Sequence, residues 1–128
     1  MFINKSVNIV LPVKPIYAIE ILDEAKKYEF RKKLCQKEIE KIYIYATAPV
    51  KMIVGEAEVV NKLIMDKNEM WRRTQIYAGI SKEFYDWYFE KQTYACAYEI
   101  GRVKRYSLPV TLDSMGIKHV PQSFIYVY

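Results

Sequence analysis

The chain has 128 residues, of which 52% are hydrophobic and 27% are charged, a balance typical of a globular protein and not of a disordered one. It carries 20 Lys and Arg residues against 15 Asp and Glu residues, which gives a net charge of +5 and a pI near 9.1. This length favours one domain spanning residues 1–128, because domains most often contain about 100–150 residues. With only Cys35 and Cys96, in unrelated contexts, the sequence excludes a disulfide-rich secreted scaffold.

The N-terminal segment, residues 1–13, lacks the charged start, long apolar centre and small-residue cleavage site of a signal peptide. No apolar run in the sequence approaches the ~20 residues that are needed to cross a bilayer. Both cysteines are interpreted as free thiols in a reducing compartment. These features predict a cytoplasmic protein with no membrane partner.

The first predicted element is a strand over residues 8–13, which is rich in Val and Ile and ends at prolines. Pro15 is then well placed as the first residue of a short amphipathic helix over residues 15–24. Charged and aromatic residues alternate strictly over residues 27–31. This period of two predicts a second strand with its aromatic side chains on one face.

Two further strands are predicted over residues 41–47 and 52–60, and Gly55 indicates a β-bulge or a close approach of another backbone. The periodicity then becomes helical from Asp66, an N-cap candidate, to Gly79, a C-cap candidate. Ser81 begins a second helix that runs to about Phe89. The central part of the chain is therefore predicted to be helical.

Strand patterns return over residues 93–106 and 123–128, with one helical turn over residues 112–116 between them. The sequence thus predicts an α+β fold with about six strands and three helices. We expect a small mixed barrel that has a short helix after the first strand and a two-helix insertion in the centre.

Most enzyme signatures are missing from the sequence. His119 is the single histidine, which excludes a metal site made of several histidines. Four glycines leave little room for a phosphate-binding loop, and none of the common dinucleotide or nucleophile motifs is present. The sequence therefore predicts no metal and no cofactor.

Basic residues gather in two places: Lys26, Lys27, Arg31, Lys32 and Lys33 around Glu29, and Arg102, Lys104 and Arg105. Such clusters can neutralise phosphates, and the 12 tyrosines offer rings that can stack on bases. The same features are typical of a solvated face and of half-buried strand residues. Nucleic-acid binding and a slightly basic surface both remain open on this basis.

Lys26, Glu29 and Arg31 form the most suggestive constellation, because strand pleating brings Glu29 and Arg31 onto one face. A lysine desolvated near a carboxylate can act as a base or nucleophile, and an arginine can hold a phosphate or carboxylate with two hydrogen bonds. The alternative is an ordinary ion network on a wet sheet face.

Motifs along nearly the whole chain, from about residue 9 to residue 127, point to a known family. The order of these motifs resembles that of ASCH domains, a branch of the PUA-like superfamily. The matching motifs are Val13-Lys14-Pro15, Tyr17-Ala18, Ile21-Leu22, Lys26-Lys27-Tyr28-Glu29-Phe30-Arg31, residues 42–49, residues 53–56, Trp71, residues 78–81 and residues 121–124.

The resemblance implies a PUA-like pseudo β-barrel of about six strands with a helix-lined cleft that binds RNA or a modified nucleoside. The resembling branch is that of predicted transcriptional regulators, which implies a role in transcription or translation control. Some relatives hydrolyse N4-acetylcytidine and others cleave RNA. An amidohydrolase acting on an acylated nucleoside, or a ribonuclease, is therefore the alternative to simple binding.

The signature lysine of the family falls on Lys26 and its arginine on Arg31, whereas Glu24 replaces the signature glycine. Glu29 occupies the position of a catalytic threonine in the amidohydrolase branch, so that branch's catalytic set is incomplete here. We expect Lys26 and Arg31 to contact phosphate or carbonyl oxygens, and Glu29 to accept hydrogen bonds from a base edge. In an enzyme, Lys26 and Glu29 would be the acid/base residues.

Lys14, Thr47 and Ser123 are expected to add further ligand contacts. Tyr28 and Tyr45 are candidates for stacking on a base, with core packing as the alternative for both. A third hypothesis is a protein-interaction module, which would use an exposed aromatic surface made by Trp71, Tyr85, Trp87 and Tyr88. No feature of the sequence specifies an oligomeric state.

Overall fold

The computed structural model describes residues 7–128, so half of the segment examined for a signal peptide lies outside the described residues. It contains six strands and three α-helices, which confirms the predicted α+β fold. In chain order these are β1 (Asn8–Val13), α1 (Pro15–Leu22), β2 (Tyr28–Arg31), β3 (Lys41–Ala46), β4 (Met52–Asp66), α2 (Lys67–Thr74), α3 (Lys82–Tyr88), β5 (Tyr94–Val110) and β6 (Ile125–Val127). Single 3₁₀ turns lie at Gln75–Tyr77 and Asp113–Met115.

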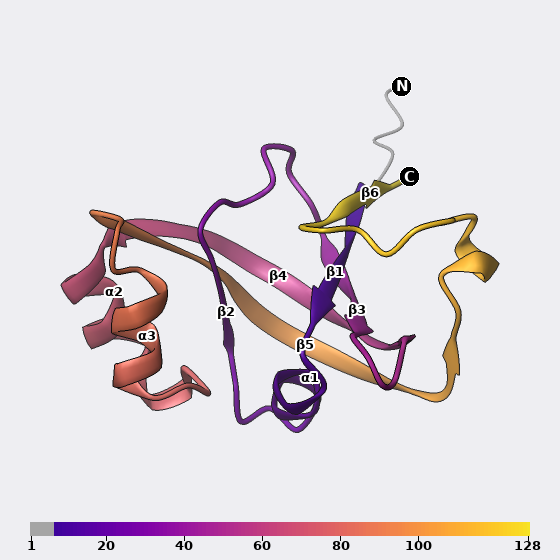
Figure 1. The fold of residues 1–128 in the computed structure, drawn as a ribbon, viewed down its shortest axis with the longest axis horizontal. Helices are drawn as coiled ribbons and strands as arrows, with labels where there is room; N and C mark the ends of the chain where they lie inside the picture. Colours follow the sequence, from indigo (N-terminus) through magenta and orange to yellow (C-terminus); the bar gives the residue numbers. More distant parts are fainter. Residues whose placement is uncertain (1–6) are drawn as a thin grey trace.

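The strands form one sheet in the order β2-β5-β4-β3-β1-β6. β1 and β3 are parallel, and the other neighbouring strands are antiparallel. The sheet curls strongly, but its edge strands β2 and β6 do not pair with each other, so the pseudo-barrel is open (Figure 1). The end of β1 and the strand β2 therefore lie on opposite sides of the opening in the sheet.

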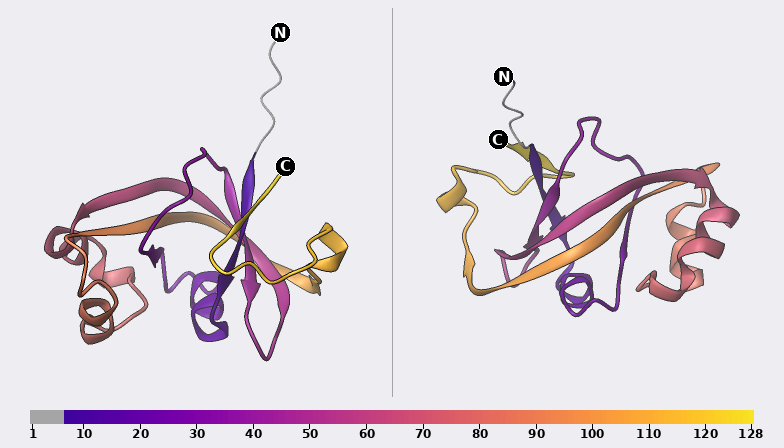
Figure 2. Two further views of the ribbon diagram at one scale, coloured as in Figure 1. Left: turned by 45° about the horizontal axis from the view of Figure 1, so that its top comes forward. Right: turned by 180° about the vertical axis from the view of Figure 1, so that it is seen from behind.

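β4 and β5, with 15 and 17 residues, form a long curved ribbon across the molecule. α2 and α3 lie together at one end of this ribbon, and α1 lies near its middle (Figures 1 and 2). The sequence predicted that β4 would end at residue 60. The structure extends it to Asp66, because residues 61–66 pair with residues 94–99 of β5. None of the helices in the described part of the chain is long and apolar enough to cross a membrane.

Both helices at the end of the ribbon begin at the capping residues that the sequence predicts. The Asp66 side chain accepts hydrogen bonds from the backbone N–H groups of Asn68 and Glu69. The Ser81 hydroxyl accepts one from the backbone N–H of Phe84. These bonds satisfy N–H groups that have no partner within a helix, and they fix the starting points of α2 and α3.

Two predictions about individual backbone positions have a structural explanation. At Gly55 an added Cβ would lie 2.5 Å from the carbonyl oxygen of Lys104, and the β4–β5 register shifts at the same place. Close approach and bulge therefore both occur there. Glu24, which replaces the family's glycine, has a φ of 63°, a left-handed conformation that glycine adopts without steric cost.

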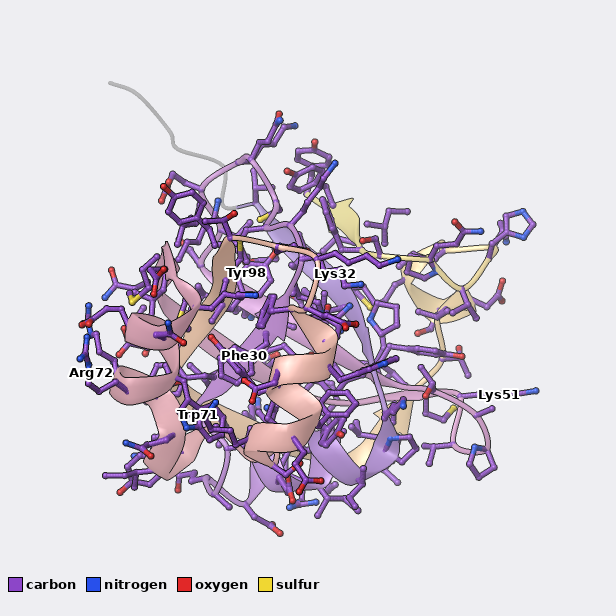
Figure 3. All side chains as sticks on the ribbon, turned by 60° about the vertical axis from the view of Figure 1, so that its left-hand side comes forward. Phe30, Lys32, Lys51, Trp71, Arg72 and Tyr98 are labelled. Carbon is purple, nitrogen blue, oxygen red and sulfur yellow. The ribbon has the colours of Figure 1, made fainter. Side chains whose placement is uncertain are left out.

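The core is divided between the curled sheet and the helical end. Inside the curl, Ile9, Leu11, Ile42 and Ile44 pack against α1 residues. At the helical end, Phe30 of β2 packs against α2 and α3 side chains, with its ring centroid 5.3 Å from that of Tyr85. Figure 3 shows Phe30 and Trp71 in this region beside the two helices. Burial of each such side chain contributes about 1.5–3 kcal/mol and fixes the helices against the sheet.

Candidate functional site

A cavity of about 460 Å³ lies where β1 ends, between α1, β2 and α3. Ligand sites for small molecules have volumes of about 300–1,000 Å³, so this cavity has the size of such a site. Five of the six predicted site residues line it: Lys14, Lys26, Glu29, Arg31 and Thr47. The other lining residues are Pro12, Val13, Tyr17, Phe30, Lys32, Ile80, Phe84, Trp87 and Tyr88.

Lys26 is a buried lysine at this cavity, with a relative exposure of 1%. Its Nζ donates a hydrogen bond of 2.5 Å to the carbonyl oxygen of Ala78 and lies 4.0 Å from Glu29 Oε1. The ammonium also lies 5.4 Å from the ring centroid of Tyr17 and 5.1 Å from that of Phe30. Cation–π contacts and one carbonyl therefore replace most of the water that a lysine normally keeps.

Burial lowers the pKa of Lys26 from its ordinary value of 10.5, because the charged form has lost most of its hydration. The carboxylates of Glu29 and Glu20 raise that pKa in opposition, and Arg31 lowers it further. Of the described residues, Glu20 also contributes a buried carboxylate oxygen, Oε2, that has no hydrogen-bond partner. Lys26 therefore loses its proton more easily than an exposed lysine does.

Glu29 and Arg31 form an ion pair on β2, as the pleating of that strand predicts. Arg31 donates to Glu29 Oε2 from Nη2 at 3.0 Å and from Nε at 3.3 Å. The Glu29 side chain is 8% exposed and that of Arg31 is 20% exposed. Because both bonds use Oε2, the other oxygen, Oε1, is left facing Lys26 at 4.0 Å and available to a donor on a ligand.

Arg31 also crosses the gap in the open barrel. Its Nη2 donates to the carbonyl oxygen of Pro12, at the end of β1, although β1 and β2 are not neighbours in the sheet. One guanidinium therefore connects the two sides of the cavity and holds Glu29 at its base.

Aromatic side chains form the wall of the cavity on the side of α3. Phe84 and Tyr88 stack with centroids 6.1 Å apart and an interplanar angle of 15°, and Tyr17 lies 6.3 Å from Phe84. Sequence reasoning missed this wall. The signal was the spacing of Phe84, Trp87 and Tyr88, which places them on one face of the predicted helix.

The proposed aromatic interaction surface does not form as one patch. Tyr85 is buried at 1% exposure and packs at 4.9 Å from the half-buried Trp71, so both belong to the core of the helical end. Tyr88 is half-buried in the cavity wall. Trp87 alone of these four residues is largely exposed.

Three other predicted contact residues lie outside the cavity lining. Ser123 is exposed in the segment before β6, whose pairing with β1 covers only Asn8 to Val10. Tyr45 is 3% exposed and packs in the core with Ile53 and its neighbours, and Tyr28 packs against the helical end. Core packing, the alternative weighed for the two tyrosines, is what the structure shows.

The basic cluster of Arg102, Lys104 and Arg105 lies outside the lining of the main cavity. Arg105 pairs with Asp23 at 2.5 Å, whereas Arg102 and Lys104 line a different, mixed-charge groove together with Glu56 and other acids. The described lining of the main cavity contains four cationic side chains and a single carboxylate, Glu29: the cations are Lys14, Lys26, Arg31 and Lys32. No group of three or more His, Cys, Asp or Glu residues that could hold a metal ion occurs between residues 7 and 128.

Comparison with known proteins assigns the family. No protein-family model matches the chain. It is 28% identical over 122 residues to the ATP synthase subunit alpha of Ureaplasma parvum serovar 3, but it spans only 15% of that relative's length. The crystal structure of ASCH from Zymomonas mobilis is 28% identical and has a TM-score of 0.86, over 94% of this chain and 87% of that one.

The ASCH domain-containing ribonuclease of Zymomonas mobilis is 32% identical over 107 residues, which cover 83% of this chain and 72% of the relative. Similar sequence and similar fold agree along most of both chains. The chain therefore belongs to the ASCH domain family.

Proposed function

We propose that residues 1–128, as a single ASCH domain, bind RNA or a nucleotide-sized ligand in the cavity and act in transcription or translation regulation. One observation carries this proposal: a polar cluster of the buried Lys26 and Glu29 and the half-buried Arg31 lines a cavity with aromatic walls. Folding alone gains little from burying these three charges, since desolvation costs about as much as their pairing returns.

The chemistry of the cavity matches a single unpaired nucleotide. Aromatic walls stack on bases of any sequence, with about 1–3 kcal/mol for each stacked base. Glu29 Oε1 can accept a hydrogen bond from an N–H group on a base edge, and Lys26 can donate to a neighbouring acceptor. A base reaches such a cavity only when it is not paired, which favours single-stranded RNA or a free modified nucleoside over duplex RNA.

Exposed lysines at the cavity supply the contacts that a phosphate requires. Lys14 and Lys32 are both exposed and both line the cavity. Their charges would attract the RNA backbone and make binding weaker at high salt. The ribonuclease name of the Zymomonas mobilis relative supports RNA as the class of ligand.

The test is the affinity of the protein for a short fluorescent single-stranded RNA, measured by anisotropy against a duplex of the same sequence. We expect Glu29→Gln and Lys32→Ala to weaken single-strand binding about tenfold, a loss of roughly 1.4 kcal/mol. Lys104→Ala, an exposed charge outside the cavity, is the matched control and should change affinity little. Equal losses in all three variants, or preference for the duplex, would reject the proposal.

A second candidate function is hydrolysis, which the burial and the lowered pKa of Lys26 favour. A lowered pKa makes the neutral amine easier to form, and a neutral amine can take a proton from a ribose 2′-hydroxyl, or from water that attacks an acylated base. Cleavage of RNA, or release of cytidine from N4-acetylcytidine, should be lost in Lys26→Met and retained in Lys33→Met, in which an exposed lysine is changed. If wild-type protein forms neither RNA cleavage products nor cytidine, hydrolysis is rejected and binding is left as the function.

A further inference from the structure

Trp87 is the most exposed aromatic residue of the cavity wall. Its side chain is 67% exposed, whereas its neighbours Phe84 and Tyr88 are half-buried. One side of the indole contacts Phe84, with ring centroids 5.6 Å apart and an interplanar angle of 47°. Among the described residues, no other aromatic ring pairs with Trp87, so an aromatic face remains available to a ligand.

Trp87 is not one of the core residues that pack α3 against the sheet. That helix is fixed by Tyr85, which is 1% exposed, and is followed by Phe89, which is 0% exposed; both pack against Phe30. Trp87 is absent from the core of the helical end. A large apolar side chain that is kept in water beside a cavity is a typical binding residue.

The charged side chains that line the cavity beside Trp87 favour a nucleic acid over an apolar protein surface. Lys32 Nζ lies 5.1 Å from the ring centroid of Tyr88, the residue that follows Trp87. Figure 3 shows Lys32 beside the end of α3. Lysine is depleted in the cores of protein–protein interfaces. An ammonium at the aromatic wall of a cavity can contact the phosphate of a base that stacks beside it.

We propose that Trp87 forms a second nucleobase subsite. The base next to the one in the cavity stacks on the indole, and the phosphate between the two bases contacts Lys32. This inference rests on the proposed function and narrows its ligand, because it makes the ligand an RNA of two or more nucleotides and not a free nucleoside. The lining charges, four cationic groups against one paired carboxylate among the described residues, agree with an anionic chain.

The test compares three probes by calorimetric titration: cytidine monophosphate, the trinucleotide ApCpA, and an ApCpA analogue whose adenines are replaced by abasic sugars. The last two probes carry the same phosphates, so the ratio of their affinities measures stacking of a flanking base. We expect a ratio of about 5 or more in wild-type protein, since stacking contributes about 1–3 kcal/mol. Trp87→Ala should reduce the ratio to near 1, and Trp87→Phe should retain most of it.

Ile76→Ala is the matched control, because Ile76 is 84% exposed and lies outside the cavity lining. It should keep the wild-type ratio. An equal ratio in wild type and Trp87→Ala, with cytidine monophosphate still bound, overturns the second subsite and leaves the proposed function intact. Failure of wild-type protein to bind any of the three probes overturns both. A change in sedimenting mass in Trp87→Ala, with an unchanged ratio, makes Trp87 a protein contact and also overturns the subsite.

Discussion

Lys26 Nζ donates a 2.5 Å hydrogen bond to the carbonyl oxygen of Ala78, 52 residues further along the chain. Gly79 follows with a φ of 68°, and a Cβ at that position would lie only 2.6 Å from Lys26 Cγ. The turn between the two insertion helices therefore packs along one side of the lysine side chain, from Cβ to Nζ. The central insertion thus positions Lys26 as well as supplying the aromatic wall.

Replacement of Gly79 by alanine should destabilise the protein and displace Lys26. The cost has two parts: about 1–2 kcal/mol for a left-handed non-glycine residue and about 1–3 kcal/mol for overpacking against the lysine. Gly116→Ala isolates the first part, because Gly116 has a φ of 76° with nothing within 4 Å of an added Cβ. Urea denaturation should show the larger loss for Gly79→Ala. Equal losses of unfolding free energy in the two variants would mean that the Lys26 side chain moves aside without cost.

The lowered pKa of Lys26 predicts a pH-dependent difference between wild-type protein and Lys26→Met. Between that lowered pKa and the ordinary value of 10.5, the unfolded chain binds a proton that the folded chain does not. The free energy of unfolding of wild type should therefore rise relative to that of Lys26→Met as the pH increases through this window, by at most about 1.4 kcal/mol per pH unit. Taking the difference removes the contribution of the tyrosines, which ionise in the same range. Parallel curves from urea denaturation would contradict the lowered pKa.

The Glu29–Arg31 pair should be strongly coupled. Arg31→Met leaves Glu29 buried without its hydrogen-bonding partner, which should cost about 2–4 kcal/mol; the side chain of Arg31 is 20% exposed, so the loss is smaller than for a fully buried pair. Glu29→Gln combined with Arg31→Met should cost less than the sum of the single changes. A double-mutant cycle measures this coupling. Additive losses would show that the two groups do not interact energetically.

Glu24 provides a test of backbone conformation at the position of the family's glycine. With φ at 63°, Glu24→Gly should be more stable than Glu24→Ala by about 1 kcal/mol. The neighbouring Asp23 has a φ of −82°, so the order should reverse there and Asp23→Gly should be the less stable variant. Thermal melts of the four variants check both orders. The same order at both positions would contradict the left-handed conformation of Glu24.

The polar part of the site could be predicted because its residues are close in sequence. The site residues lie in one short segment, the turn before β2 and β2 itself: Lys26, Glu29 and Arg31. Local periodicity and the family signature both predict the positions of residues in such a segment. The Asp66 and Ser81 caps were likewise local signals, and the structure confirms them.

What the sequence did not predict depends on contacts between distant segments. The extension of β4 to Asp66 comes from its pairing with β5, a segment distant in sequence. The bridge from Arg31 to Pro12 requires an open, curled sheet, and no local pattern specifies that geometry. The aromatic wall was missed for the same reason. The spacing of aromatic residues on α3 indicates a binding surface only once the fold places that helix beside the cavity.

Binding of RNA in the cavity is tested most directly by NMR titration of ¹⁵N-labelled protein with a short single-stranded RNA. We predict shifts at the backbone amides of Lys26, Glu29 and Arg31 and at the indole N–H of Trp87, with the amide shifts strongly reduced in Glu29→Gln. Shifts confined to Arg102, Lys104 and Arg105, or no shifts at all, would contradict the assignment of the cavity as the RNA site.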